Sequence, residues 1–188
     1  MIGKPAAAAA LLLFLAAGCG GGVPVDSPSS PLGTGGDPFK ECVPSPPGTT
    51  TTDGITALEN HSTGTVTVER VSLYGAHHLL IVHAVVVPIH YDAIGFSEIW
   101  PPSRDTLSQP GVEWDKRVAA IGARVPPFRG RSLDLAARLG LLRNLVLGVR
   151  PTARTGTAAG VQVLYQENGK QYELRTHTRI VVLVDKNC

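Results

Sequence analysis

The residues best suited to bind a metal ion are histidines, and their spacing matches no common type of metal site. They are His61, His77, His78, His83, His90 and His177. On a strand His77 and His83 share a face, but six positions separate them, so their rings cannot meet unaided. The chain has no Cys-x-x-Cys, His-x-His or His-Glu-x-x-His motif, and its one methionine is Met1. We therefore expect no metal site and no cofactor.

Nucleophilic catalysis by serine has no better support. The segment 95–99 lacks the second glycine of a Gly-x-Ser-x-Gly motif, and 103–106 lacks the lysine of Ser-x-x-Lys. Carboxylates that could act as acid and base fall in expected loops, where such groups are usually solvated. They are Asp92, Glu98, Asp105, Glu113 and Asp115. We expect no catalytic residue and a protein that is not an enzyme.

Three aromatic residues mark a possible binding loop. Phe96, Trp100 and Trp114 lie within residues 94–114, among prolines and charged residues. Aromatic side chains on a loop can anchor a partner or a sugar. Alternatively, they cover the open end of a β-sandwich, and this packing role is the favoured interpretation.

The elements that would position these residues are short β-branched runs separated by turns, a pattern typical of a sandwich or barrel. We expect strands over 54–59, 65–74, 77–88, 94–100, 117–125, 145–150 and 179–184, with 77–88 as the central strand. In 65–74, a bulge near Glu69 and Arg70 would turn Val66, Val68, Val71 and Leu73 toward one core. The segment 132–143 is expected to form one short helix capped by Ser132.

The clearest element is a hairpin whose strands, 161–167 and 170–176, flank Asn168-Gly169. Asn-Gly suits a type I′ turn, in which both central residues take positive φ. This register places Glu167 opposite Lys170, Tyr165 opposite Tyr172 and Val163 opposite Leu174, so that each pair is complementary. We predict a mainly β fold: an antiparallel sandwich of about seven or eight strands.

The stretch from Thr51 to Pro88, a strand, an Asn-containing turn and two long strands, resembles the opening of bacterial immunoglobulin-like domains. The pattern is also similar to small actinobacterial lipoproteins without an assigned activity. The resemblance implies an immunoglobulin-like sandwich, although the Cys-Trp-Cys core of true immunoglobulins is absent. It implies no particular function, because one fold serves many functions.

The N-terminus has the features of an export signal. Lys4 precedes an unbroken apolar run over 6–17, whose helix would reach about 18 Å and not span a hydrocarbon core of roughly 30 Å. The run ends in Leu15-Ala16-Ala17-Gly18-Cys19, which resembles a bacterial lipobox with its leucine one position early. The resemblance implies cleavage before Cys19, acylation of that cysteine, and anchoring to the outer face of the cytoplasmic membrane. Plain secretion and a retained anchor are the alternatives.

The cysteines and the composition define the expected domains. Residues 1–18 form the signal peptide, residues 19–50 a flexible Gly/Pro/Ser-rich linker and residues 51–188 a single domain. With Cys19 acylated, Cys42 and Cys188 remain, and an even pair in an exported domain favours a disulfide. Two free thiols or an intermolecular bond are the alternatives.

The charge of the chain is close to balanced. Without Lys4, 16 lysines and arginines stand against 15 acidic residues. This balance argues against nucleic acid as a partner and against a polybasic membrane patch. We expect a membrane-anchored envelope lipoprotein with a non-catalytic binding or interaction domain, whose partner is unknown. The alternatives are an assembly accessory of an envelope or export complex, and a metal carrier or enzyme.

Overall fold

The computed structural model describes residues 30–35, 40–90, 93–103, 113–185 and 188, and most of them belong to β-strands. The strands are β1 (Leu32–Gly33), β2 (Lys40–Ser45), β3 (Thr51–Asn60), β4 (Val66–Tyr74), β5 (Leu79–Ile89), β6 (Gly95–Ser97), β7 (Val118–Ala119), β8 (Arg124–Val125), β9 (Leu142–Pro151), β10 (Thr155–Ala158), β11 (Gly160–Glu167), β12 (Lys170–Arg175) and β13 (Arg179–Val184). A 3-10 turn, η1 (Trp114–Lys116), and a short helix, α2 (Leu133–Arg138), lie between β6 and β9.

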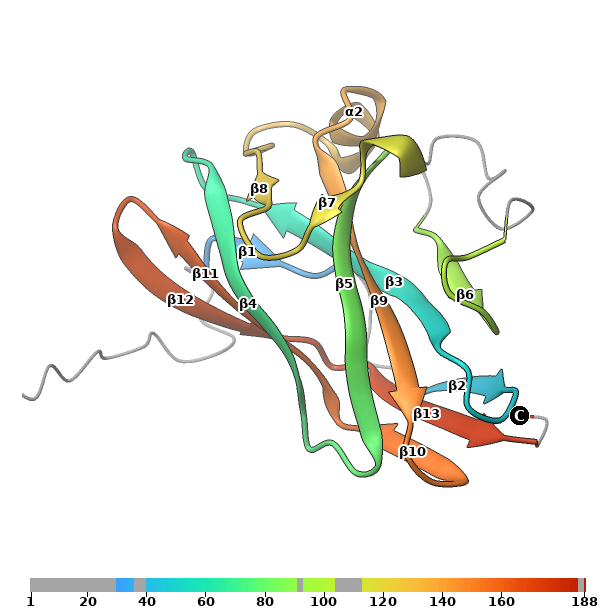
Figure 1. The fold of residues 1–188 in the computed structure, drawn as a ribbon. Coiled ribbons are helices and arrows are strands. Elements are labelled where there is room, and N and C mark those ends of the chain that lie inside the picture. The colour runs from blue at the N-terminus through green and yellow to red at the C-terminus, as the bar shows by residue number, and fades with distance from the viewer. Residues whose placement is uncertain (1–29, 36–39, 91–92, 104–112, 186–187) are drawn as a thin grey trace, which may run out of the picture.

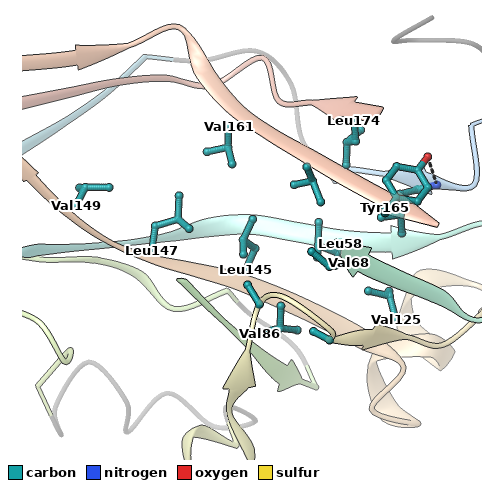
Figure 2. Close-up of a cluster of buried hydrophobic side chains, with 14 of the residues drawn as sticks. Leu58, Val68, Val86, Val125, Leu145, Leu147, Val149, Val161, Tyr165 and Leu174 are labelled. Atoms are coloured by element: carbon teal, nitrogen blue, oxygen red, sulfur yellow. Dashed lines mark hydrogen bonds between the residues drawn. The ribbon is translucent and has the colours of Figure 1, made fainter. Parts of the chain in front are cut away.

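The strands form two layers around one core (Figure 1). One layer is the sheet β1-β3-β9-β5-β7, to which β6 adds beside β3. The other layer holds two smaller sheets, β12-β11-β4-β8 and β10-β13-β2. Leu58 and Leu147 from the first layer meet Val161 and Leu174 from the second in a single apolar cluster (Figure 2). The predicted mainly β sandwich is confirmed, and the described residues form thirteen strands rather than seven or eight, because several strands have only two or three residues.

The hairpin at 160–175 confirms the predicted register. Tyr165 pairs with Tyr172, Val163 with Leu174 and Glu167 with Lys170, while Asn168 and Gly169 have φ values of 51° and 76°. The predicted bulge in β4 is also present, because Tyr165 pairs with Val68 and the preceding residue with Arg70. Local sequence alone was sufficient for both features.

The prediction that 77–88 is the central strand is wrong. The central position belongs to β9, which pairs along its length with both β3 and β5. β5 has only the two-residue β7 on its other side, and Leu80 is exposed. A continuous apolar run does not specify which strand is central, because strand order depends on partners far away in the sequence.

The single strand predicted over 117–125 is also wrong. β7 pairs with β5 in the first layer, whereas β8 pairs with β4 in the second. Between them, the Ala120 N–H donates to the Ala84 carbonyl and the Gly122 N–H to the Val68 carbonyl. Gly122 has φ 84°, which a glycine adopts without strain. The segment therefore crosses from one layer to the other.

The predicted linker over 19–50 includes residues that belong to the sandwich, so its boundary needs correction. Leu32 is buried where β1 pairs with β3, and β2 lies parallel to β13, which makes the sheets not wholly antiparallel. β2 contributes Val43 to the interior. It also contains Pro44, and because proline is rare inside strands, this strand was not predicted from the sequence. Cys42 of β2 and Cys188 form the expected disulfide, with their Cα atoms 5.8 Å apart.

The predicted helix over 132–143 is present but shorter, because α2 ends at Arg138. Ser132 caps it by accepting a hydrogen bond from the Leu135 N–H, as expected. Gly140, at φ 61°, then turns the chain into β9.

Reduction of the disulfide is expected to lower the free energy of unfolding by about 3–5 kcal/mol, because the bond closes a loop of 146 residues in the unfolded chain. Urea denaturation with and without reductant measures this loss, with C42A/C188A as the matched variant. Equal midpoints for the oxidised and reduced protein would contradict it.

Candidate ligand-binding cleft

Two of the three predicted aromatic residues lie together on the outer face of the first layer. The Trp100 and Trp114 rings meet edge to face with centroids 5.8 Å apart, and His83 stacks on Trp100 at 5.1 Å. Beneath them lies Gly148, where a Cβ atom would come within 2.9 Å of the Trp100 ring. Phe96 belongs to β6, is 38% exposed and has no part in this aromatic cluster. The two tryptophans cover the sheet, and a binding role for the three residues stays a prediction.

The described histidines lie in separate places. His61 is 3.4 Å from the Glu59 carboxylate, His90 is the same distance from Glu113, and His83 packs on a tryptophan. Among the described residues, no group of three His, Cys, Asp or Glu side chains is arranged to hold a metal ion. Cys19, the predicted lipidation site, lies outside the described residues. No helix in the described part of the chain is long and apolar enough to cross a membrane.

Two carboxyl groups that sequence reasoning did not single out face the interior near one end of the sandwich. Glu41 of β2 is 2% exposed, neither of its carboxyl oxygens has a hydrogen-bond partner, and burial raises its pKa to about 10. Asp53 of β3, 3% exposed, repels the charge of Glu41, and its own pKa is raised to about 6 by burial. A catalytic acid must reach its substrate, and these groups are enclosed, so their effect falls on stability.

A concave site with a distinctive lining lies beside the crossing segment, which builds one of its walls. A cleft of about 560 Å³ opens between the ends of β5 and β9 on one side and the chain from η1 to β8 on the other. Its lining residues are Val86, Pro88, Lys116, Val118, Ala119, Ile121, Gly122, Ala123, Arg124 and Arg143. These residues come from three separate segments, at 86–88, at 116–124 and at 143, so no local sequence motif predicted the site.

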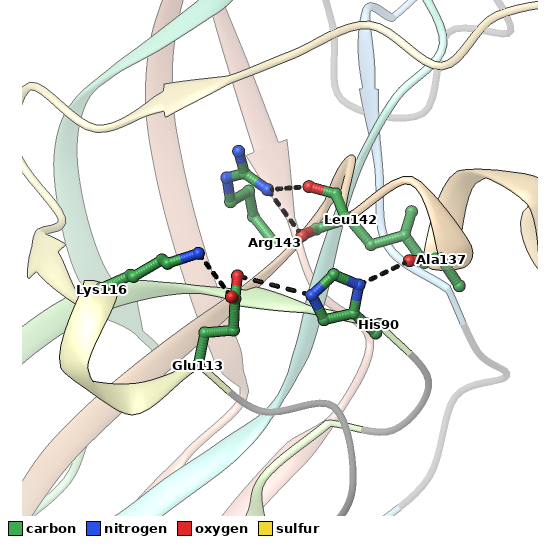
Figure 3. A network of polar contacts seen from close by, with 7 residues as sticks. His90, Glu113, Lys116, Ala137, Leu142 and Arg143 are labelled. Atoms are coloured by element: carbon green, nitrogen blue, oxygen red, sulfur yellow. Dashed lines mark hydrogen bonds and ion pairs between the residues drawn. The ribbon is translucent and has the colours of Figure 1, made fainter.

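Two of the three cationic side chains of the cleft, Arg143 and Lys116, are held by defined contacts (Figure 3). Arg143 Nη1 donates to the Gly140 carbonyl at 2.7 Å and to the Leu142 carbonyl at 3.0 Å, and burial lowers the pKa of this guanidinium. Lys116 forms an ion pair with Glu113. The third cation, Arg124, is an exposed residue of β8. Three cations therefore meet at the cleft, and one carboxylate stands beside them.

Glu113 connects the cleft to the helix α2. Its hydrogen bond with Lys116, followed by the charge of Lys116 and then that of His90, lowers the pKa of the Glu113 carboxyl. Nε2 of His90 faces Glu113, and the other ring nitrogen, Nδ1, lies 3.2 Å from the Ala137 carbonyl in α2 (Figure 3). This chain of contacts joins η1, β5 and α2 at the same end of the sandwich.

The chemistry of the lining is that of a binding site. Val118 is 51% exposed and Ile121 is 70% exposed, so an apolar rim lies beside the cations. The described residues that line the cleft include no hydroxyl, thiol, imidazole or carboxyl side chain. The arrangement suits an anionic group joined to an apolar one, since each part of such a ligand finds a matching part of the lining.

Comparison with known proteins identifies no family. No family model matches the chain, and no curated protein matches it either. Among solved structures, it is similar to the ASH / PapD-like domain 7 of human CEP192, at 12% identity and a TM-score of 0.39, over 98% of this chain and 100% of that one. A similarity at this level decides neither fold nor function.

Replacing Glu41 with glutamine is expected to stabilise the protein at neutral and alkaline pH. In the unfolded chain Glu41 loses its proton above about pH 4.5, whereas the folded protein retains it up to about pH 10, so the free energy of unfolding falls as the pH rises between these values. At pH 7 the gain of E41Q should be about 2–3 kcal/mol, and it should vanish near pH 4.

Urea denaturation from pH 4 to pH 9 measures this difference, with E98Q, an exposed carboxylate, as the matched control. Stability curves for E41Q and the wild-type protein that stay parallel over this range would show that Glu41 is ionised in the folded protein.

Proposed function

We propose that this chain is an exported lipoprotein, anchored through acyl chains on Cys19, whose non-catalytic sandwich binds an anionic, partly apolar ligand or partner in the cleft. The observation that carries the proposal is the lining of the cleft: three cations from η1, β8 and β9 beside an exposed apolar rim. The described lining residues include no nucleophile or general base, and the nearby Glu113 carboxylate is paired with Lys116 and His90, which favours binding over catalysis.

The cations are positioned before any ligand arrives. Two backbone carbonyls hold Arg143, and Glu113 holds Lys116. A ligand therefore meets guanidinium and ammonium groups that have already lost much of their rotational freedom, which reduces the entropic cost of binding. Arg143 lies partly out of water, where its attraction for an anion is screened less than at the open surface.

The export part of the proposal rests on the N-terminal sequence and on the disulfide. A Cys42–Cys188 bond is typical of an oxidising compartment outside the cytosol. Ten residues separate Cys19 from Ser30, where the described structure begins, so an acylated Cys19 would hold the domain near a membrane surface. Two acyl chains on Cys19 would make this attachment stable.

Intact mass of the membrane-extracted protein tests the anchor. We expect a chain that begins at Cys19, carries a diacylglyceryl group and gains two hydrogens on reduction. An unacylated chain recovered from the medium would contradict the lipoprotein part of the proposal and leave the cleft unaffected.

The cleft is tested with 8-anilinonaphthalene-1-sulfonate, a fluorescent probe that joins a sulfonate to apolar rings. We expect saturable binding to the folded protein, weakened about fivefold in K116Q/R124Q, because each exposed charge contributes up to about 1 kcal/mol. R150Q/R154Q removes two exposed arginines that lie outside the cleft and is the matched control. Equal affinities for the two double variants would reject the cleft as the site, provided that both have the same urea midpoint.

A further inference from the structure

The end of the sandwich that carries the cleft also gathers most of its exposed apolar side chains. Eight large hydrophobic residues are exposed in the described part of the chain, and five of them lie within residues 113–143: Val118, Ile121, Leu133, Leu135 and Leu139. Three of them are leucines of α2 and its C-cap, whose buried side is formed by Ala136 and Ala137. A small domain in water gains nothing from leaving such side chains exposed together, so this surface suits an apolar or interfacial partner.

The same segment holds the excess positive charge of the chain. Residues 113–143 contain seven lysines and arginines and three acidic residues, whereas the rest of the chain has ten against twelve. The seven cations are Lys116, Arg117, Arg124, Arg129, Arg131, Arg138 and Arg143. Asp134 pairs with Arg138 and Glu113 with Lys116, which leaves a net excess. We name the exposed side chains of residues 113–143 the basic end.

Ser30, where the described structure begins, lies beside the basic end. Leu32 pairs with Asn60 of β3, and the carbonyl of Asn60 accepts a hydrogen bond from the Phe128 N–H within residues 113–143. The His61 N–H donates to the Pro31 carbonyl, and the His61 ring lies 4.9 Å from the Phe128 ring. Ser30, one residue earlier, is held by the Tyr165 hydroxyl at 2.7 Å. From there, the eleven residues back to Cys19 reach at most about 36 Å when fully extended.

We propose that the basic end docks onto a bilayer that contains anionic lipids, with the exposed leucines and Ile121 at the acyl boundary and the arginines and Lys116 at the lipid phosphates. The mixture of cationic and apolar side chains matches the chemistry of an anionic lipid surface, where each basic residue adds attraction and each buried apolar group adds affinity. The cleft then receives a headgroup phosphate between Lys116, Arg124 and Arg143. This inference rests on the proposed function, since it names the partner of the same cleft.

The short reach of the tether supports this occupant over a soluble one. A chain anchored at Cys19 and fixed to the domain at Ser30 would keep the basic end within about 36 Å of the bilayer. The local concentration of lipid headgroups at this end is therefore high, and a weak individual affinity is sufficient for docking.

The test uses the full mature chain with Cys19→Ala, so that no acyl chain contributes to binding. We expect it to sediment with vesicles of equal parts phosphatidylglycerol and phosphatidylcholine at low salt, and to bind pure phosphatidylcholine at least tenfold more weakly. Added salt should weaken the binding to anionic vesicles, because the attraction is screened. No sedimentation with anionic vesicles, or equal binding to both kinds of vesicle, would overturn the proposal.

Variants in the same background locate the surface. R129Q/R131Q should weaken vesicle binding about thirtyfold, since each basic residue near an anionic surface contributes about a factor of five. L135S/L139S should also weaken it, while R150Q/R154Q should bind as the parent chain does. If R150Q/R154Q lost as much vesicle binding as R129Q/R131Q, the attraction would depend on the total charge of the protein, and the basic end would not be the docking surface.

Failure of this test is distinguishable from failure of the proposed function. The acyl group on Cys19 is measured by mass on the native protein, and the cleft by the fluorescent probe in solution. For the native acylated protein on the same vesicles, hydrogen exchange should slow at 116–124 and 133–141 but not at 152–154. Unchanged exchange at both 116–124 and 133–141 would reject docking even where acylation and probe binding are present.

Discussion

The crossing of residues 118–125 from one layer of the sandwich to the other is the constraint on which the cleft and the basic end depend. Two backbone hydrogen bonds fix it, from Ala120 to Ala84 in β5 and from Gly122 to Val68 in β4. Because Ala120, Ala123 and Val125 are buried in the core, Ile121 and Arg124 must face outward. The packing that closes this end of the sandwich therefore also places apolar and cationic side chains on its surface.

The sequence was informative where structure depends on near neighbours. The Asn168-Gly169 turn, the bulge beside Val68 and the Ser132 cap each follow from a few adjacent residues, and each is present. The central position of β9, the parallel pairing of β2 with β13 and the split of 117–125 depend on contacts between distant segments. A continuous apolar run contains no information about such partners, which explains why these features were missed.

The net charge of the whole chain gave no sign of the basic end, because it averages over segments of opposite charge. The nearly equal numbers of acidic and basic residues argued against a basic membrane patch, yet the excess cations all fall within 113–143 and the remainder of the chain is slightly acidic. Folding brings this segment to one end, where Pro31 and β1 also lie. The proposed anchor at Cys19 and the basic end would then act together, the first supplying proximity and the second orientation.

Neutron reflectometry of the acylated protein on a supported bilayer with anionic lipid tests the central claim most directly, because it measures where the domain lies relative to the headgroups. The account predicts that protein density begins at the phosphate layer, with no water between the bilayer and the domain. A hydrated gap approaching the roughly 36 Å reach of the chain from Cys19 to Ser30 would contradict it and describe a domain that extends away from the membrane.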